Sequence, residues 1–174
     1  QEIRITLNQF DTEFENVYSG KNIKDVPKFE LHPRGMTALL DAIGRSINET
    51  GDRLRKMDEK DRPAKVLFVI LTDGLENASQ EFRDRAKILE MVKRQEEEYL
   101  WKFVYIGAQQ DAIAEGSSMG FHKGSSLNYT NNSRGTEALF NSLHSYASGV
   151  ACMTPGEYVL SVKTGEAFTQ EDIN

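Results

Sequence analysis

The run Val66–Leu71 constrains the fold most, because it holds six successive apolar residues with no polar residue between them. A strand with one face in water alternates apolar and polar residues, whereas an unbroken run is typical of a strand covered on both faces. The run is also far shorter than the ~20 residues that a membrane-spanning helix needs. We therefore expect a strand at Lys65–Leu71 inside a mostly parallel sheet.

Stretches with helical spacing separate this strand from others along the chain. We expect strands at Glu2–Phe10, Glu13–Tyr18, Lys65–Leu71, Trp101–Ile106 and Ser125–Tyr129, and helices at Thr37–Met57, Gln80–Leu100, Asp111–Met119 and Ser133–Ala147. The first two strands, with the turn Ser19–Asn22, read as a hairpin. Strands that alternate with helices of this length are joined by right-handed crossovers. The sequence predicts a doubly wound, Rossmann-like α/β domain with helices on both faces of the sheet.

The α/β pattern covers residues 1–148, and the chain changes character after it. The β-rich run Tyr158–Val162 lies between Gly156 and Gly165, and an acidic, polar stretch follows it to Asn174. We expect residues 149–174 to form a C-terminal arm with one short strand and a mobile tip.

Net charge and cysteine content narrow the class of protein. The chain carries 21 Lys and Arg against 27 Asp and Glu, a formal charge of −6, which argues against binding to a nucleic-acid backbone. No apolar run is long enough to cross a membrane. The single cysteine, Cys152, excludes an internal disulfide and a cysteine-based zinc cluster, and it suits a reducing compartment. We expect a cytoplasmic protein that binds neither nucleic acid nor membrane.

Two oxygen-bearing side chains stand where ligands bind in such sheets. Asp73 comes directly after the buried strand and before Gly74, while Thr37 follows Gly35 at the start of the first long helix. Ligands of open α/β sheets lie beyond the carboxyl ends of the strands, so we expect the two side chains to converge there. Hydroxyl and carboxylate oxygens suit a hard divalent cation. On local grounds alone, Thr37 can equally be the N-cap of its helix, and Asp73 the cap of a turn.

The segments around these residues carry a family resemblance. Gly35–Ile43 reads Gly-Met-Thr-Ala-Leu-Leu-Asp-Ala-Ile, and Val69–Ser79 reads Val-Ile-Leu-Thr-Asp-Gly-Leu-Glu-Asn-Ala-Ser. Both resemble the von Willebrand factor A (vWA) domain family in its stand-alone bacterial and phage form, and the resemblance extends from Ile3 to Tyr146. It implies a metal-ion-dependent adhesion site (MIDAS) built from three loops, with Thr37 in the second loop and Asp73 in the third. It further implies Mg²⁺ or Mn²⁺ there, with a carboxylate of a protein partner completing the coordination.

The first loop of the family pattern is absent, since no Asp-x-Ser-x-Ser run occurs in these residues. In the family that loop follows the first strand, which is the middle strand of the sheet and would precede Gln1. An empty place there would leave two buried strands with unpaired backbone groups, a cost that a small domain does not tolerate. We expect the strand to come from an N-terminal segment. A separate chain, or a strand donated by a neighbour such as Tyr158–Val162, is the alternative.

Residues beside the two candidate ligands are expected to hold the loops. Asp41 lies one turn beyond Thr37, and we expect it to support the loop by hydrogen bonding rather than to bind metal. Glu76 and Asn77 are expected to order the loop after Asp73 or to line its rim.

Other chemistry-bearing residues show no pattern of a site. His32, His122 and His144 lack the spacing of metal ligands, and no Gly-x-Ser-x-Gly elbow marks a hydrolase nucleophile. Asp11 can join the rim of the site, although a turn role fits it better. A metal-assisted hydrolytic or phosphoryl-transfer enzyme using Asp73 would need a second carboxylate and a general base, and the sequence offers no clear pair.

The first functional hypothesis is therefore a metal-dependent protein-binding module that is not an enzyme. Its metal ligands are Thr37 and Asp73, supported by Gly35, Asp41, Gly74, Glu76 and Asn77. The alternative is a structural or scaffold protein with an incomplete metal site. Its terminal segments would be exchanged within a homo-oligomer or completed by a strand-donating chain.

Overall fold

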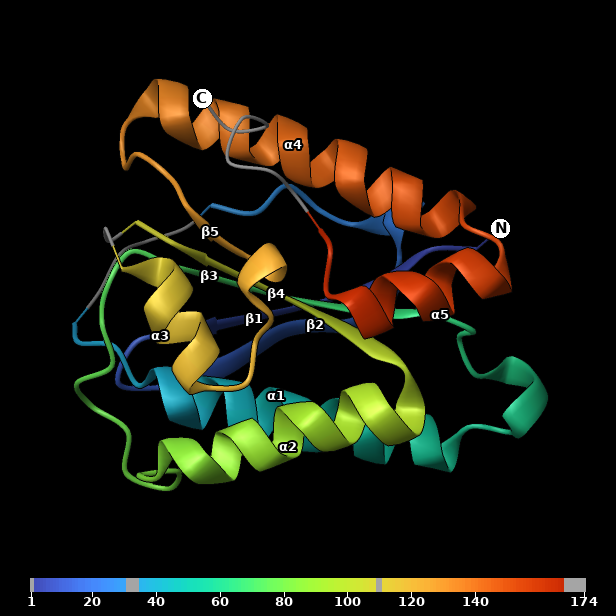
Figure 1. Cartoon of the computed structure of the whole chain (residues 1–174), viewed down its shortest axis with the longest axis horizontal. Coiled ribbons are helices and arrows are strands. Elements are labelled where there is room, and N and C mark those ends of the chain that lie inside the picture. The colour runs from blue at the N-terminus through green and yellow to red at the C-terminus, as the bar shows by residue number, and fades with distance from the viewer. Residues whose placement is uncertain (1, 31–34, 109–110, 168–174) are drawn as a thin grey trace.

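The computed structural model describes residues 2–30, 35–108 and 111–167 as a mixed α/β protein (Figure 1). The strands are β1 (Arg4–Phe10), β2 (Phe14–Asn22), β3 (Val66–Thr72), β4 (Trp101–Gly107) and β5 (Ser126–Asn128). The helices are α1 (Leu39–Lys56), α2 (Arg85–Tyr99), α3 (Ala112–Ser118), α4 (Ser133–Cys152) and α5 (Pro155–Thr164), with short 3₁₀ turns at Ile23–Asp25, Glu59–Asp61 and Lys123–Ser125. No helix in these ranges is both long and apolar enough to cross a membrane.

Three of the strands form a parallel sheet in the order β3-β4-β5. Val66 lies opposite Trp101 at one end of the β3–β4 ladder, and Thr72 lies opposite Gly107 at the other. β1 and β2 form a separate antiparallel hairpin. In Figure 1, α1 and α2 lie on one side of the parallel sheet, and α4 and α5 lie on the other. The prediction of an α/β fold whose parallel sheet is flanked by helices is confirmed.

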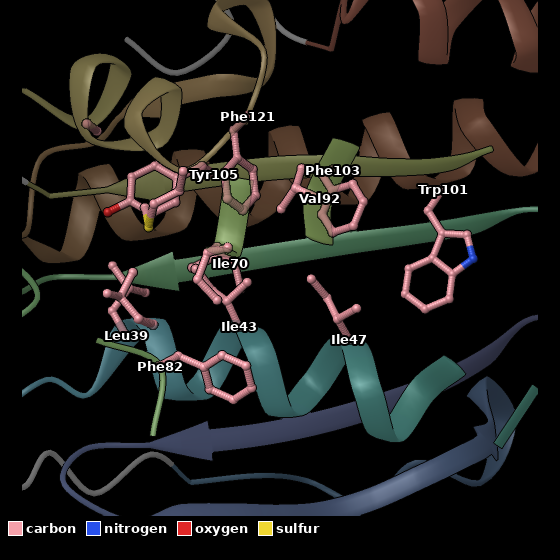
Figure 2. Packing of buried hydrophobic residues seen from close by; sticks show 14 residues of the cluster. Leu39, Ile43, Ile47, Ile70, Phe82, Val92, Trp101, Phe103, Tyr105 and Phe121 are labelled. Carbon is pink, nitrogen blue, oxygen red and sulfur yellow. The ribbon is translucent and has the colours of Figure 1, made fainter. Parts of the chain in front are cut away.

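Apolar side chains from α1, α2 and the sheet fill one side of the fold (Figure 2). Leu39, Ile43 and Ile47 point from α1 toward the strands and are almost completely buried. On the sheet, Phe103 stacks against Trp101 with 6.2 Å between ring centroids. Burial of these side chains anchors α1, and with it the loop that carries the first candidate ligand.

The other side of the sheet packs against α4. Val104 and Ile106 of β4 cluster there with Leu139 of α4. Because successive β4 residues face opposite helical layers, every residue of that strand is buried. β3 is an end strand of the described sheet, and most of its residues are only half-buried. An unbroken apolar run thus identifies a sheet strand without fixing its place in the sheet.

Two predicted helix starts are wrong by a few residues. The helix predicted from Thr37 begins at Leu39, with Ala38 at the N-cap position and no side-chain cap, so Thr37 is not the N-cap. The helix predicted from Gln80 begins only after Asp84, whose side chain accepts a hydrogen bond from the first turn. In both cases an irregular, hydrogen-bonded loop takes the place of the predicted first turn.

The C-terminal part is helical, which corrects the predicted strand at Tyr158–Val162. α4 runs on to Cys152, past its predicted end, and α5 follows almost at once. α5 begins with a capping box, in which the Thr154 hydroxyl accepts the N–H of Glu157 and the Glu157 carboxylate accepts the N–H of Thr154. Pro155 at the first helical position completes this start signal. Residues 168–174, part of the expected mobile tip, lie outside the described ranges.

The N-terminal hairpin is confirmed, but its turn lies elsewhere than predicted. Ser19–Asn22 is part of β2 and pairs with β1. The turn is at Asp11–Glu13, where the Asp11 carboxylate accepts the N–H of Glu13 at 2.7 Å. An aspartate side chain in this position closes a turn in place of a backbone carbonyl. The Asp11 carbonyl also accepts the N–H of Ala38 at 2.7 Å, which links the hairpin to the start of α1.

α5 closes the base of the β3–β4 ladder. The Tyr158 hydroxyl accepts the Val66 N–H at 3.1 Å and donates to the Val66 carbonyl at 2.9 Å. The buried Lys102 Nζ donates to the carbonyls of Ser161 and Glu166 at 2.5 and 2.7 Å. These contacts satisfy carbonyls at the end of the helix. The C-terminal helix is therefore attached where the strands begin, away from the edge where they end.

The edge of β3 that faces away from β4 has no strand partner among the described residues. The Thr72 carbonyl accepts the N–H of Ala108, so Thr72 and the alternate residues before it direct their backbone groups toward β4. Leu67, Val69 and Leu71 accordingly direct theirs toward the open edge. A row of this kind is a template for pairing with another strand.

Candidate functional site

The candidate site lies at the carboxyl end of β3, where the chain turns sharply. The Thr72 hydroxyl accepts the N–H of Gly74 at 3.3 Å and donates to its carbonyl at 3.0 Å. Asp73, between them, is exposed to solvent. The turn thus places Asp73 at the carboxyl edge of the sheet, as expected for a ligand-binding position in an α/β fold.

Thr37 comes from the loop before α1 and meets this turn. A Cβ atom added to Gly74 would lie 2.5 Å from the Thr37 hydroxyl oxygen, so the two residues are in direct contact. Gly35, two residues earlier, has φ of +51°, a conformation that favours glycine. The structure therefore brings the Thr37 hydroxyl against the residue next to Asp73.

The loop before α1 and the loop after β3 are locked together by backbone hydrogen bonds. The Thr37 N–H donates to the Asn77 side-chain oxygen at 2.8 Å, and the Asn77 N–H donates back to the Thr37 carbonyl at 3.0 Å. One side-chain oxygen and three backbone groups thus fix the relative position of the two loops.

Glu76 binds the start of α1. Its carboxylate accepts the Leu40 N–H at 2.9 Å, the Ala78 and Ser79 N–H groups at 3.0 and 2.8 Å, and the Ser79 hydroxyl at 2.8 Å. Partial burial disfavours the ionised form, but these hydrogen bonds outweigh it and lower the pKa of Glu76. The carboxylate therefore stays ionised and occupied in holding the loop.

Asp41, in the first turn of α1, also holds the loop after β3. It is buried, and its carboxylate accepts the backbone N–H groups of Gln80, Glu81 and Phe82 at 2.8, 3.0 and 2.7 Å. Its own N–H donates to the Ser79 hydroxyl at 3.0 Å. The side chain is thus engaged in supporting the loop, the kind of contact expected for it.

Tyr129 is a neighbour of the site that sequence reasoning did not single out. It follows β5 at the same edge of the sheet, where its N–H donates to the Gly107 carbonyl at 3.0 Å. Burial raises the pKa of Tyr129, and the negative charge of Asp73 adds to this effect. An aromatic residue directly after a short strand was the available signal, but single residues at strand ends are common.

The described residues supply only part of a metal site. Thr37 offers a hydroxyl oxygen and Asp73 a carboxylate, whereas Asp41 and Glu76 use their carboxylates on backbone N–H groups. In the described ranges, no group of three or more His, Cys, Asp and Glu side chains could hold a metal ion. Mg²⁺ in proteins is often held by one or two carboxylates with several waters. The two oxygens therefore fit part of such a sphere, and further ligands would have to come from elsewhere.

Of the remaining candidates, Asp11 lies beside the loop that carries Thr37, since its carbonyl accepts the Ala38 N–H and its Cβ lies 3.9 Å from the position of a Cβ added to Gly35. Asp11 serves the hairpin turn, and His144 is exposed on α4. His122 pairs with Glu96, 3.3 Å away. His32 lies outside the described residues.

No protein-family model matches the chain, and neither a curated protein nor a solved structure shows significant similarity to it. The vWA resemblance therefore remains a prediction that depends on the segments around Thr37 and Asp73.

Proposed function

We propose that the chain is a metal-dependent protein-binding module of the vWA type, in which Mg²⁺ or Mn²⁺ at Thr37 and Asp73 bridges to an acidic side chain of a partner. One observation carries the proposal. The Thr37 hydroxyl is held against Gly74, directly beside Asp73, by the two hydrogen bonds that Thr37 exchanges with Asn77. This contact joins a hydroxyl-bearing loop to a carboxylate-bearing loop at the carboxyl edge of the sheet, which is where ligands of α/β folds bind.

The chemistry of the two donors supports an external carboxylate as the further ligand. Asp73 contributes one negative charge and the Thr37 hydroxyl contributes none. A divalent cation held by this pair keeps a net positive charge and attracts another anionic oxygen, more strongly in a partly dehydrated cleft than in water.

Apolar side chains beside the two ligands fit contact with a protein. Met36, next to Thr37, is 54% exposed, and Leu75, next to Gly74, is 51% exposed. Large exposed apolar side chains around a polar centre are typical of interaction sites.

We further propose that another strand lies beside β3, and the open edge of β3 supports this. Leu67, Val69 and Leu71 direct unpaired backbone groups to that edge, and a parallel strand there would end near Asp73. In the vWA pattern this strand carries the Asp-x-Ser-x-Ser ligands. We propose that it is supplied by polypeptide outside these residues, from an N-terminal segment or another chain.

A structural or scaffold protein with an incomplete metal site is the second candidate. It is favoured by the absence, in the described ranges, of any cluster of three possible metal-binding side chains. In this case the β3 edge would pair between subunits, and no cation would be needed.

A Mg²⁺ titration separates the two candidates. The thermal unfolding midpoint of the protein should rise with Mg²⁺ and return with a chelator, because a ligand that binds only the folded state stabilises it. Asp73→Ala should abolish this response, whereas Asp52→Ala, an exposed carboxylate on α1, should leave it intact. Capture of a protein partner should likewise require Mg²⁺ and Asp73. If the folded protein shows no response to Mg²⁺ or Mn²⁺ by unfolding or calorimetry, the metal-bridge proposal fails and the scaffold candidate takes its place.

A further inference from the structure

A cavity of about 550 Å³ lies between α2, the end of α3 with the segment after it, and α5, and none of the loop residues just described lines it. It is bounded by the end of α2 near Leu100 and by Val162 of α5, the helix attached where the strands begin. Its volume falls in the range of about 300–1,000 Å³ that small-molecule sites occupy.

Glu96 is the central polar residue of this cavity. Its side chain is only 11% exposed, and the His122 imidazole lies 3.3 Å away. Burial and the charge of Lys102 lower the pKa of His122, so this imidazole supplies little positive charge at neutral pH. Lys102 lies near enough to interact with it, but the Lys102 ammonium donates to the carbonyls of Ser161 and Glu166. Burial raises the pKa of Glu96 to about 7, although the charge of Lys102 opposes this and that of Glu97 adds to it. The carboxylate is thus buried with too little compensation from the chain itself.

Ser117 provides a second polar atom that the fold leaves unsatisfied. Its hydroxyl oxygen is buried on the cavity wall and has no hydrogen-bond partner among the described residues. Buried hydroxyls without a partner are uncommon in folded proteins and call for a water or a ligand.

The rest of the lining divides into an apolar wall and a charged mouth. Leu89, Leu100 and Phe121 provide apolar surface, whereas Lys93, Glu97 and Lys163 are exposed at the surface, two ammonium groups against one carboxylate. The lining thus combines a buried acid and hydroxyl with apolar side chains and an exposed rim on which ammonium groups predominate.

We propose that this cavity binds a small zwitterionic molecule of the amino-acid type, whose amine contacts Glu96 and Ser117. Its apolar body lies along Phe121, and its carboxylate faces Lys93 and Lys163. The amine supplies the positive charge and the hydrogen bonds that the buried acid and hydroxyl lack. This site uses none of the residues of the proposed metal site, so the two proposals stand or fall separately.

Three six-carbon probes test the proposal on the complete chain. 6-Aminohexanoate carries both charges, hexylamine only the amine, and hexanoate only the carboxylate. We expect saturable binding in the order 6-aminohexanoate, hexylamine, hexanoate, with amide NMR shifts centred on Gly120, Phe121 and His122. Absence of saturable binding, hexanoate binding as well as 6-aminohexanoate, or shifts centred elsewhere would overturn the proposal.

Variants on one helix give a matched control. Glu96→Gln should weaken 6-aminohexanoate binding about tenfold, as expected when a charged hydrogen bond is lost. Glu98→Gln should change nothing, because Glu98 pairs with Arg94 on the surface of α2 and does not line the cavity. Ser117→Ala should weaken binding less than Glu96→Gln and serves as the second test if the first variant does not fold. Equal losses in Glu96→Gln and Glu98→Gln, or none in both Glu96→Gln and Ser117→Ala, would contradict the assignment.

Discussion

Thr37 and Asn77, 40 residues apart in the chain, exchange two hydrogen bonds, at 2.8 Å from the Thr37 N–H and at 3.0 Å from the Asn77 N–H. This pair joins the loop before α1 to the loop after β3, so the two loops behave as one unit. Glu76 and Asp41 reinforce this link. The carboxylate of Glu76, in the loop after β3, accepts the N–H of Leu40 in α1. The carboxylate of Asp41, in α1, accepts the N–H of Phe82 in that loop. The carboxyl edge of β3 is thereby held rigidly around Asp73.

Asp41→Ala should destabilise the protein strongly. The substitution leaves the backbone N–H groups of Gln80, Glu81 and Phe82 without their acceptor, and Asp41 is only 7% exposed. We expect a loss of about 2–4 kcal/mol in the free energy of unfolding, from the cost of unsatisfied buried donors. Urea unfolding measures it, with Asp52→Ala as the exposed control. A loss equal to that of the control would show that the hydrogen bonds to Asp41 contribute nothing to the free energy of unfolding.

Gly74→Ala tests the contact between the two loops. The new methyl group would lie 2.5 Å from the Thr37 hydroxyl oxygen, and we expect a destabilisation of about 1–3 kcal/mol from overpacking. Thr37→Ala removes that oxygen, so the double variant should lose less stability than the sum of the two single variants. Strict additivity in this double-mutant cycle would mean that Thr37 does not meet Gly74 in solution.

The strands and their order along the chain could be predicted because apolar runs such as Trp101–Ile106 carry their own signal. The predicted strand at Tyr158–Val162 was wrong for an instructive reason. Its residues have high β propensity, but the capping box of Thr154 and Glu157, with Pro155 between them, sets the helix. Tertiary contacts of Tyr158 with Val66 then hold that helix in place, and local sequence does not reveal such contacts.

Tyr158→Phe should weaken the attachment of α5. It removes the hydroxyl that bridges the N–H and the carbonyl of Val66, while keeping the buried ring. We expect a loss of about 1–2 kcal/mol. In this variant, amide hydrogen exchange should accelerate more in α5 than in α1. Tyr99→Phe, at a residue that is 55% exposed, is the control. Unchanged exchange in α5 would contradict the bridging role.

Glu96 should make the stability depend on pH. Burial raises its pKa to about 7 from a usual value of 4.5, so the folded protein keeps a proton that the unfolded chain has already lost between these values. Its contribution is complete below pH 4.5 and is lost as the pH rises through 7. We expect the free energy of unfolding of the protein to fall relative to that of Glu96→Gln across this window. Parallel curves from pH 4.5 to 7.5 would show that Glu96 titrates normally.

The candidate site could be predicted in part. Thr37 and Asp73 could be identified as candidate metal ligands, because Thr37 follows a glycine and Asp73 follows a buried strand. The structure brings their loops into contact. The hydrogen bonds from the backbone of residues 80–82 to Asp41 could not be predicted in detail, because they form in a loop where the sequence indicated a helix. The cavity lined by Glu96 and Ser117 could not be predicted from the sequence, because its residues come from separate helices and share no spacing.

The most direct test of the proposed metal site is Mn²⁺-induced broadening of amide NMR signals, because a paramagnetic ion broadens the signals of nearby nuclei. We predict that low Mn²⁺ concentrations broaden Thr37, Gly74 and Tyr129 first and leave α5 unaffected, and that Asp73→Ala removes the effect. Broadening that is centred away from the end of β3, or that persists unchanged in Asp73→Ala, would contradict the account.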